Sequence, residues 1–229
     1  MPSKADLLNR AAMAIDNSLG DSGIRDTVAA YSYGEDKLRE GRGLLETAQA
    51  AASAQQVADG RQLHATAAFA QANEVAREAY QALAKLARAS CDKPTLTILG
   101  LVGPEPRATG EFLKAAFHLF DAAPQVPALA ERFGYNAEKL AAKRAKISAL
   151  QTADQEQGSL MGAAQKATQT QQAAFEALED WLAEYLKIAK VALREDPQQL
   201  EKIGVVARTG KTAAQRAARK KTPPATPTS

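Results

Sequence analysis

The segment "YSYGEDKL" at residues 31–38 is followed, 102 positions later, by the similar segment "FGYNAEKL" at residues 133–140. The same offset continues without a gap through the residues that follow both segments. Similarity at a fixed spacing is the sequence signature of an internal repeat, which decides the fold of the whole chain. Matches that are not alanine include Tyr33 with Tyr135, Lys37 with Lys139, Arg42 with Arg144, Leu45 with Ile147, Gln55 with Gln157 and Lys85 with Lys187.

The repeat predicts two tandem copies, residues 1–103 and 104–206, followed by a basic, disordered tail at 207–229. Apolar residues recur at spacings of three, four and seven in both copies, which is the period of an amphipathic helix. We therefore predict an all-α fold in which each copy contributes a short helix and a long antiparallel αα-hairpin, packed as an elongated helical bundle. Gly60 and Gly162 are the expected turns of the two hairpins.

Shorter elements are expected ahead of each hairpin. The periodicity predicts helices over about residues 4–18 and 107–122, each followed by a brief linking helix. Asn136 is a predicted N-cap, because it directly precedes the helical sequence "AEKL". The segment "CDKPTLTILGLVGPEP" at residues 91–106 looks non-helical and is expected to connect the two copies.

Composition favours long helices that pack closely. Alanine is the most frequent residue and aromatic residues make up 5% of the chain, so stability must come from many small contacts. Cys91 is the single cysteine, which excludes an intramolecular disulfide and fits a reducing compartment. The N-terminus has no apolar signal-peptide core, and no apolar run is long enough to span a membrane. We expect a cytoplasmic protein.

Charge is distributed unevenly along the chain. The formal net charge is +3, but no acidic residue follows Glu201. A flexible arm with such a surplus of cations attracts polyanions without reading sequence, so its cations are possible contacts to nucleic acid or an anionic surface. An equally simple role is solubility. The cations are Arg208, Lys211, Arg216, Arg219, Lys220 and Lys221.

The segment "IGVVARTGKT" at residues 203–212 ends like a phosphate-binding loop. Such a loop needs four residues between its glycines and a β-strand before them, whereas Gly204 and Gly210 are separated by five and follow a helical segment. We therefore expect no nucleotide site. At the offset of 102, Ile203 aligns with Leu101, so we interpret this segment as the end of the second copy.

Residues capable of acid–base or metal chemistry are present without the patterns that such chemistry needs. His64 and His118 belong to no zinc-binding motif, so we expect no metal, no cofactor and no catalytic residue. Four acids occupy equivalent positions in the two copies, but a di-iron site would also need Glu-x-x-His pairs, and a solvated helix face is the preferred interpretation. These acids are Glu74, Glu78, Glu176 and Asp180.

Aromatic residues are the best candidates for contacts to a protein partner or to another subunit. Those around the repeated motif are expected mainly to pack the short helix on the hairpin, with exposure to a partner as the alternative. Trp181 and Tyr185 lie on the most apolar helical segment, which either packs between the copies or forms an oligomer contact. The candidates are Tyr31, Tyr33, Phe133, Tyr135, Trp181 and Tyr185.

These features favour a non-catalytic structural protein that self-associates or docks a partner as a scaffold. The alternative is a nucleic-acid-associated protein that binds polyanions through the tail. A third hypothesis comes from a resemblance in composition: Ala-rich amphipathic helices followed by a Lys/Ala/Pro-rich tail are similar to the granule-coating phasins of polymer-storing bacteria. That resemblance implies a coat protein on a hydrophobic surface.

Overall fold

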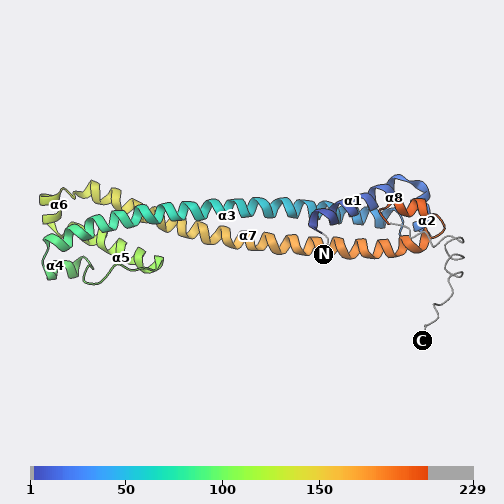
Figure 1. The fold of residues 1–229 in the computed structure, drawn as a ribbon. Helices are drawn as coiled ribbons and strands as arrows, with labels where there is room; N and C mark the ends of the chain where they lie inside the picture. Colours follow the sequence, from blue (N-terminus) through green and yellow to red (C-terminus); the bar gives the residue numbers. More distant parts are fainter. Residues whose placement is uncertain (1–2, 206–229) are drawn as a thin grey trace, which may run out of the picture. The chain divides into compact units, whose positions relative to one another are not determined.

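The computed structural model describes residues 3–205, and every regular element in that range is a helix (Figure 1). The prediction of an all-α fold is confirmed. The basic tail expected at 207–229 lies outside the described residues. The elements are α1 (Lys4–Gly20), α2 (Ser22–Ala29), α3 (Glu35–Ser90), α4 (Lys93–Ile98), α5 (Thr109–Ala122), the 3-10 helix η1 (Ala123–Gln125), α6 (Pro127–Phe133), α7 (Ala137–Ala192) and α8 (Pro197–Lys202).

The prediction of a hairpin within each copy is wrong. Both α3 and α7 are single helices of 56 residues that continue through Gly60 and Gly162. A glycine costs a helix only about 1 kcal/mol, and the flanking Ala and Gln residues are good helix formers, so neither glycine breaks the helix. The two long helices begin 102 positions apart and also end 102 positions apart.

The chain forms two compact units that differ from the predicted copies. Unit 1 comprises residues up to Ser53 together with those from Thr170 onward, and unit 2 comprises Ala54–Gln169. Each unit therefore combines the first part of one predicted copy with the last part of the other. The boundaries at 103 and 206 are not boundaries of compact units.

In unit 1, α1, α2 and α8 pack on the beginning of α3 and the end of α7. The α3 and α7 segments run antiparallel, because Gly41 near the start of α3 lies against Trp181 near the end of α7. The largest fully buried side chains of this core are Ile15, Ile24, Leu38, Leu178 and Tyr185.

Unit 2 repeats this arrangement with α4, α5 and α6 packed on the end of α3 and the beginning of α7. Arg77 of α3 holds the connection that follows α4: its guanidinium donates to the Glu105 carboxylate at 2.6 Å and to the Arg107 carbonyl at 2.9 Å. The same guanidinium lies 4.3 Å from the centre of the Phe112 ring. The core contains Leu83, Leu99, Phe112, Leu119, Leu129, Ile147 and Leu150.

An equivalent ion pair fixes the short helix in each unit. Asp16 of α1 pairs with Arg42 of α3, and Asp121 of α5 pairs with Arg144 of α7. The arginines are 102 positions apart and the aspartates 105 apart. Both pairs are exposed, so each holds register more than it adds stability.

Helices α4 and α8 are equivalent in the two units: each follows a long helix and begins with a capping aspartate. Asp92 and Asp196 cap their N-termini by accepting from the backbone N–H groups of Thr95 and Gln199. The expectation of a non-helical segment at 91–106 is therefore partly wrong, because it contains α4. These caps are 104 positions apart, so Ile203 corresponds to the buried Leu99 and not to Leu101 as predicted.

The prediction that Asn136 caps the second long helix is confirmed, since its Oδ1 accepts from the Lys139 N–H at 2.9 Å. No helix in residues 3–205 combines the length and the apolar character that crossing a membrane requires.

Candidate interaction surfaces

Three of the predicted partner contacts form a buried aromatic cluster in unit 1. Trp181 stacks on Tyr185 with ring centres 5.3 Å apart, and Tyr33 lies 5.4 Å from Tyr185. Tyr185 is fully buried and shares a hydrogen bond with Ser18 of α1. These three side chains hold α1, α3 and α7 together and present almost no surface to a partner.

The indole of Trp181 occupies the space left by Gly41, where any Cβ would overlap the ring. Its Nε1 is buried and has no hydrogen-bond partner among the described residues. Trp181 therefore packs between the two predicted copies, which was the first of the two interpretations of its apolar helix.

In unit 2, Tyr135 is also buried, and Lys139 lies 4.2 Å from the centre of its ring. Phe133 is half-buried beside Arg132. Tyr135 therefore also presents almost no surface to a partner.

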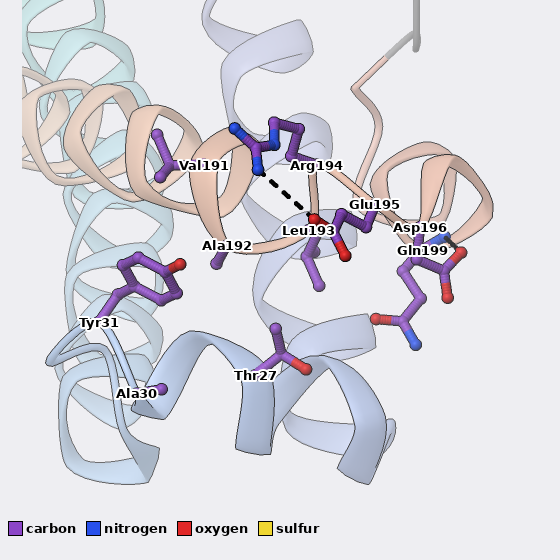
Figure 2. Close-up of a pocket in the computed structure, with 10 residues that line it drawn as sticks. All are labelled: Thr27, Ala30, Tyr31, Val191, Ala192, Leu193, Arg194, Glu195, Asp196 and Gln199. Atoms are coloured by element: carbon purple, nitrogen blue, oxygen red, sulfur yellow. Dashed lines mark hydrogen bonds and ion pairs between the residues drawn. The ribbon is translucent and has the colours of Figure 1, made fainter.

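Tyr31 is the one predicted aromatic contact that is substantially exposed, at 47% of its surface. It lies beside Val191 of α7, which is 60% exposed, at the edge of an open pocket of about 460 Å³ (Figure 2). We call this the Tyr31 surface; it comprises Thr27, Ala30, Tyr31, Val191, Ala192, Leu193, Arg194, Glu195, Asp196 and Gln199.

The polar groups of the Tyr31 surface are largely engaged with their own chain. Thr27 donates to the Gly23 carbonyl at 2.7 Å, Asp196 caps α8, and Arg194 pairs with Glu195 at 3.4 Å (Figure 2). What remains available is a tyrosine ring next to an aliphatic side chain, which suits contact with a protein surface. Val191 was missed from the sequence, although it is apolar and directly precedes the end of α7.

A second surface lies on α3 and α7 within unit 2. We define the middle segment as residues 54–73 of α3 and 147–169 of α7. Between residues 54 and 68 of α3, and from 151 to 169 of α7, no residue belongs to either buried core cluster. The two helices meet there through small or polar side chains, such as the buried Ala65 and Ala164 and the half-buried Gln157.

The middle segment exposes apolar side chains and has few charges. Its charged residues are Asp59, Arg61, Asp154, Glu156 and Lys166. Leu63 is 72% exposed, Met161 58% and Val57 52%. Depletion of charge together with exposed apolar side chains is typical of the centre of a protein–protein interface.

A groove follows the boundary between α3 and α7 along this segment. Two adjoining hollows of about 400 and 260 Å³ share Ala68 as a lining residue. Arg61 and Glu156 line the first hollow, and Lys146 lies in the second. The remaining lining residues are His64, Ala65, Leu160, Gln71, Ala72, Val75 and Ala149.

The four duplicated acids are all exposed on α3 and α7. Glu176 accepts a hydrogen bond from Gln172 at 2.9 Å, as ordinary acids on a helix surface do. Within residues 3–205, no group of three or more His, Cys, Asp or Glu side chains is arranged to hold a metal ion.

The histidines have different surroundings. The Nε2 of His118 lies 2.9 Å from the carbonyl of Ile98 and so ties α5 to the end of α4. His64 lines the groove of the middle segment.

The predicted polyanion contacts all fall outside the described residues. They are Arg208, Lys211, Arg216, Arg219, Lys220 and Lys221. In comparisons with known proteins, no family model, no curated protein and no solved structure matches the chain.

Proposed function

We propose that this chain is a non-catalytic helical assembly protein that associates through uncovered surfaces of its long helices. The observation that carries the proposal is the middle segment. Between residues 54 and 68 of α3, and between 151 and 169 of α7, the helices lack the large buried side chains found toward both ends of each helix and expose Leu63 and Met161 to solvent. Two helices that contact each other only through alanine and glutamine side chains bury little apolar surface, so their pairing is weakly stabilised. Association that buries their outer faces would add the missing apolar burial.

The polar side chains with defined partners support a structural role. Aspartates cap the short helices, and the Asp16–Arg42 and Asp121–Arg144 pairs hold the short helices on the long ones. Arg77 holds the segment between α4 and α5 through Glu105 and Arg107. These groups are committed to maintaining the fold and not to a reaction.

We further propose that the chain arose by tandem duplication. The ends of α3 and α7, the two Asp–Arg pairs and the capped helices α4 and α8 recur at nearly constant offsets. A duplicated sequence gives two units of similar construction, which suits a scaffold.

A second candidate function rests on the charge asymmetry of the sequence. The region after Glu201 contains cations and no acid, which favours salt-sensitive binding to polyanions. A coat on a hydrophobic surface is the third candidate, supported by the exposed Leu63 and Met161.

A truncation separates these functions. Removal of residues 207–229 is expected to abolish retention on heparin while leaving self-association unchanged. If the truncated protein kept its heparin affinity, the tail would not be the polyanion site. If it lost self-association, the long helices would not be the assembly surface. Co-sedimentation with lipid-coated oil droplets tests the coat function. A protein that stays in the supernatant would contradict that function.

A further inference from the structure

The middle segment offers two faces, and their charges differ. Arg61 and Leu63 are two residues apart on α3, or about 200° around the helix, so they lie on opposite sides. The groove is lined by Arg61 and Glu156, whereas Leu63 and Met161 lie outside it and are exposed.

The Leu63 face has acids and no base near its centre. Asp59 lies one turn before Leu63, and Asp154 lies two turns before Met161, so both acids lean toward that side. A second copy of the same face would bring like charges together, which is unfavourable.

The first hollow of the groove instead carries opposite charges on its two walls. Arg61 belongs to α3 and Glu156 to α7, and neither has an ion-pair partner within residues 3–205. In a twofold-symmetric interface every contact occurs twice, because a residue pair that meets in one direction also meets in the other. A twofold axis parallel to the helices places α3 of one copy over α7 of the other, so the wall that carries Arg61 faces the wall that carries Glu156.

The available surface is sufficient for a dimer. About 20 residues of each helix span about 30 Å, and two helices side by side are about 20 Å wide. The face thus offers about 600 Å² per copy, or about 1,200 Å² in the pair, which reaches the lower end of specific interfaces. Half of the uncharged lining residues are alanines, including Ala65, Ala68 and Ala72, and small side chains allow close approach of helices.

We propose that a second copy of this chain docks on the groove, so that the two middle segments form a four-helix section held in register by reciprocal Arg61–Glu156 contacts. This inference rests on the proposed assembly function and names its partner and its surface.

Charge reversal tests the contact. In Arg61→Glu, acids face acids across the interface, and in Glu156→Arg, cations face cations. Each full-length variant should self-associate at least about tenfold more weakly than the unmodified chain in sedimentation velocity. An equimolar mixture of the two variants should associate again, because both contacts in the mixed dimer then join opposite charges. Unchanged circular dichroism and melting temperature establish that each variant is folded.

Glu78→Arg and Lys166→Glu are the matched controls, because they reverse exposed charges of unit 2 that do not line the groove. Each control should dimerise like the unmodified chain. The groove is the wrong surface if the Arg61 and Glu156 variants self-associate normally, if their mixture stays dissociated, or if the controls lose as much affinity. Selective loss of association in Leu63→Gln would move the interface to the opposite face. If the unmodified chain is monomeric, the proposed assembly function is wrong. If the chain dimerises and none of these substitutions weakens the dimer, only the assignment of the groove as the interface is wrong.

Discussion

Ser32 and Gly134 have almost the same left-handed backbone conformation, with φ of 67° and 68°, and they are 102 positions apart in the chain. Each lies in the corner that leads into a long helix. A serine in this conformation is strained, whereas glycine adopts it freely.

Ser32→Gly should therefore stabilise the protein by about 0.5–1 kcal/mol, even though the side chain of Ser32 is exposed. Urea denaturation measures the change as a higher midpoint. Ser53→Gly is the matched control: inside α3 the same substitution should cost about 0.5 kcal/mol. If both substitutions lowered the midpoint, Ser32 would not be strained.

Gly41→Ala should destabilise unit 1 by about 1–3 kcal/mol, because the added methyl group overlaps the Trp181 ring. Trp181 is the single tryptophan, so its fluorescence should shift to the red as the ring is displaced. Gly43→Ala has open space and should be neutral or stabilising. Equal effects of the two changes would contradict the packing of Trp181 on Gly41.

Gly60→Ala and Gly162→Ala should each stabilise the protein by about 0.5–1 kcal/mol, since both positions lie inside continuous helices with no atom near the new methyl group. Thermal unfolding followed by circular dichroism measures the gain. A loss of stability would instead indicate that the chain turns at these glycines.

Tyr33 gives a pH-dependent prediction. Burial and the nearby Glu184 carboxylate raise the pKa of Tyr33 to about 12. Because the pKa is higher in the folded state than the ordinary value near 10, this hydroxyl contributes its full stability below about pH 10. That contribution is lost as the pH rises toward 12.

Tyr33→Phe should consequently flatten the fall in unfolding free energy between pH 10 and 12. Urea denaturation at several pH values in this range compares the variant with the unmodified chain. Parallel curves for the two proteins would show that Tyr33 ionises as easily when folded as when unfolded.

The all-α class and the positions of the short helices could be predicted from helical periodicity and from the repeat. The hairpin turns could not, because a lone glycine in an alanine- and glutamine-rich segment does not distinguish a turn from a continuous helix. The pairing of α3 with α7 depends on long-range burial, of Leu38 with Leu178 for example, which the local pattern does not encode.

The candidate site was predicted less well for a related reason. Tyr31 and Tyr33 belong to one short motif, yet Tyr31 is exposed while Tyr33 is 4% exposed and packs on Trp181. The left-handed turn at Ser32 directs the two rings to different surroundings. The exposed apolar residues of the middle segment have a helical pattern like that of the core, so only the packed structure separates them from buried ones.

Light scattering of the full-length chain tests the proposed assembly function most directly. The chain has a mass of 24.3 kDa, and association should give about twice that value, falling toward the monomer on dilution. A mass of 24.3 kDa that stays constant up to high micromolar concentration would contradict self-assembly.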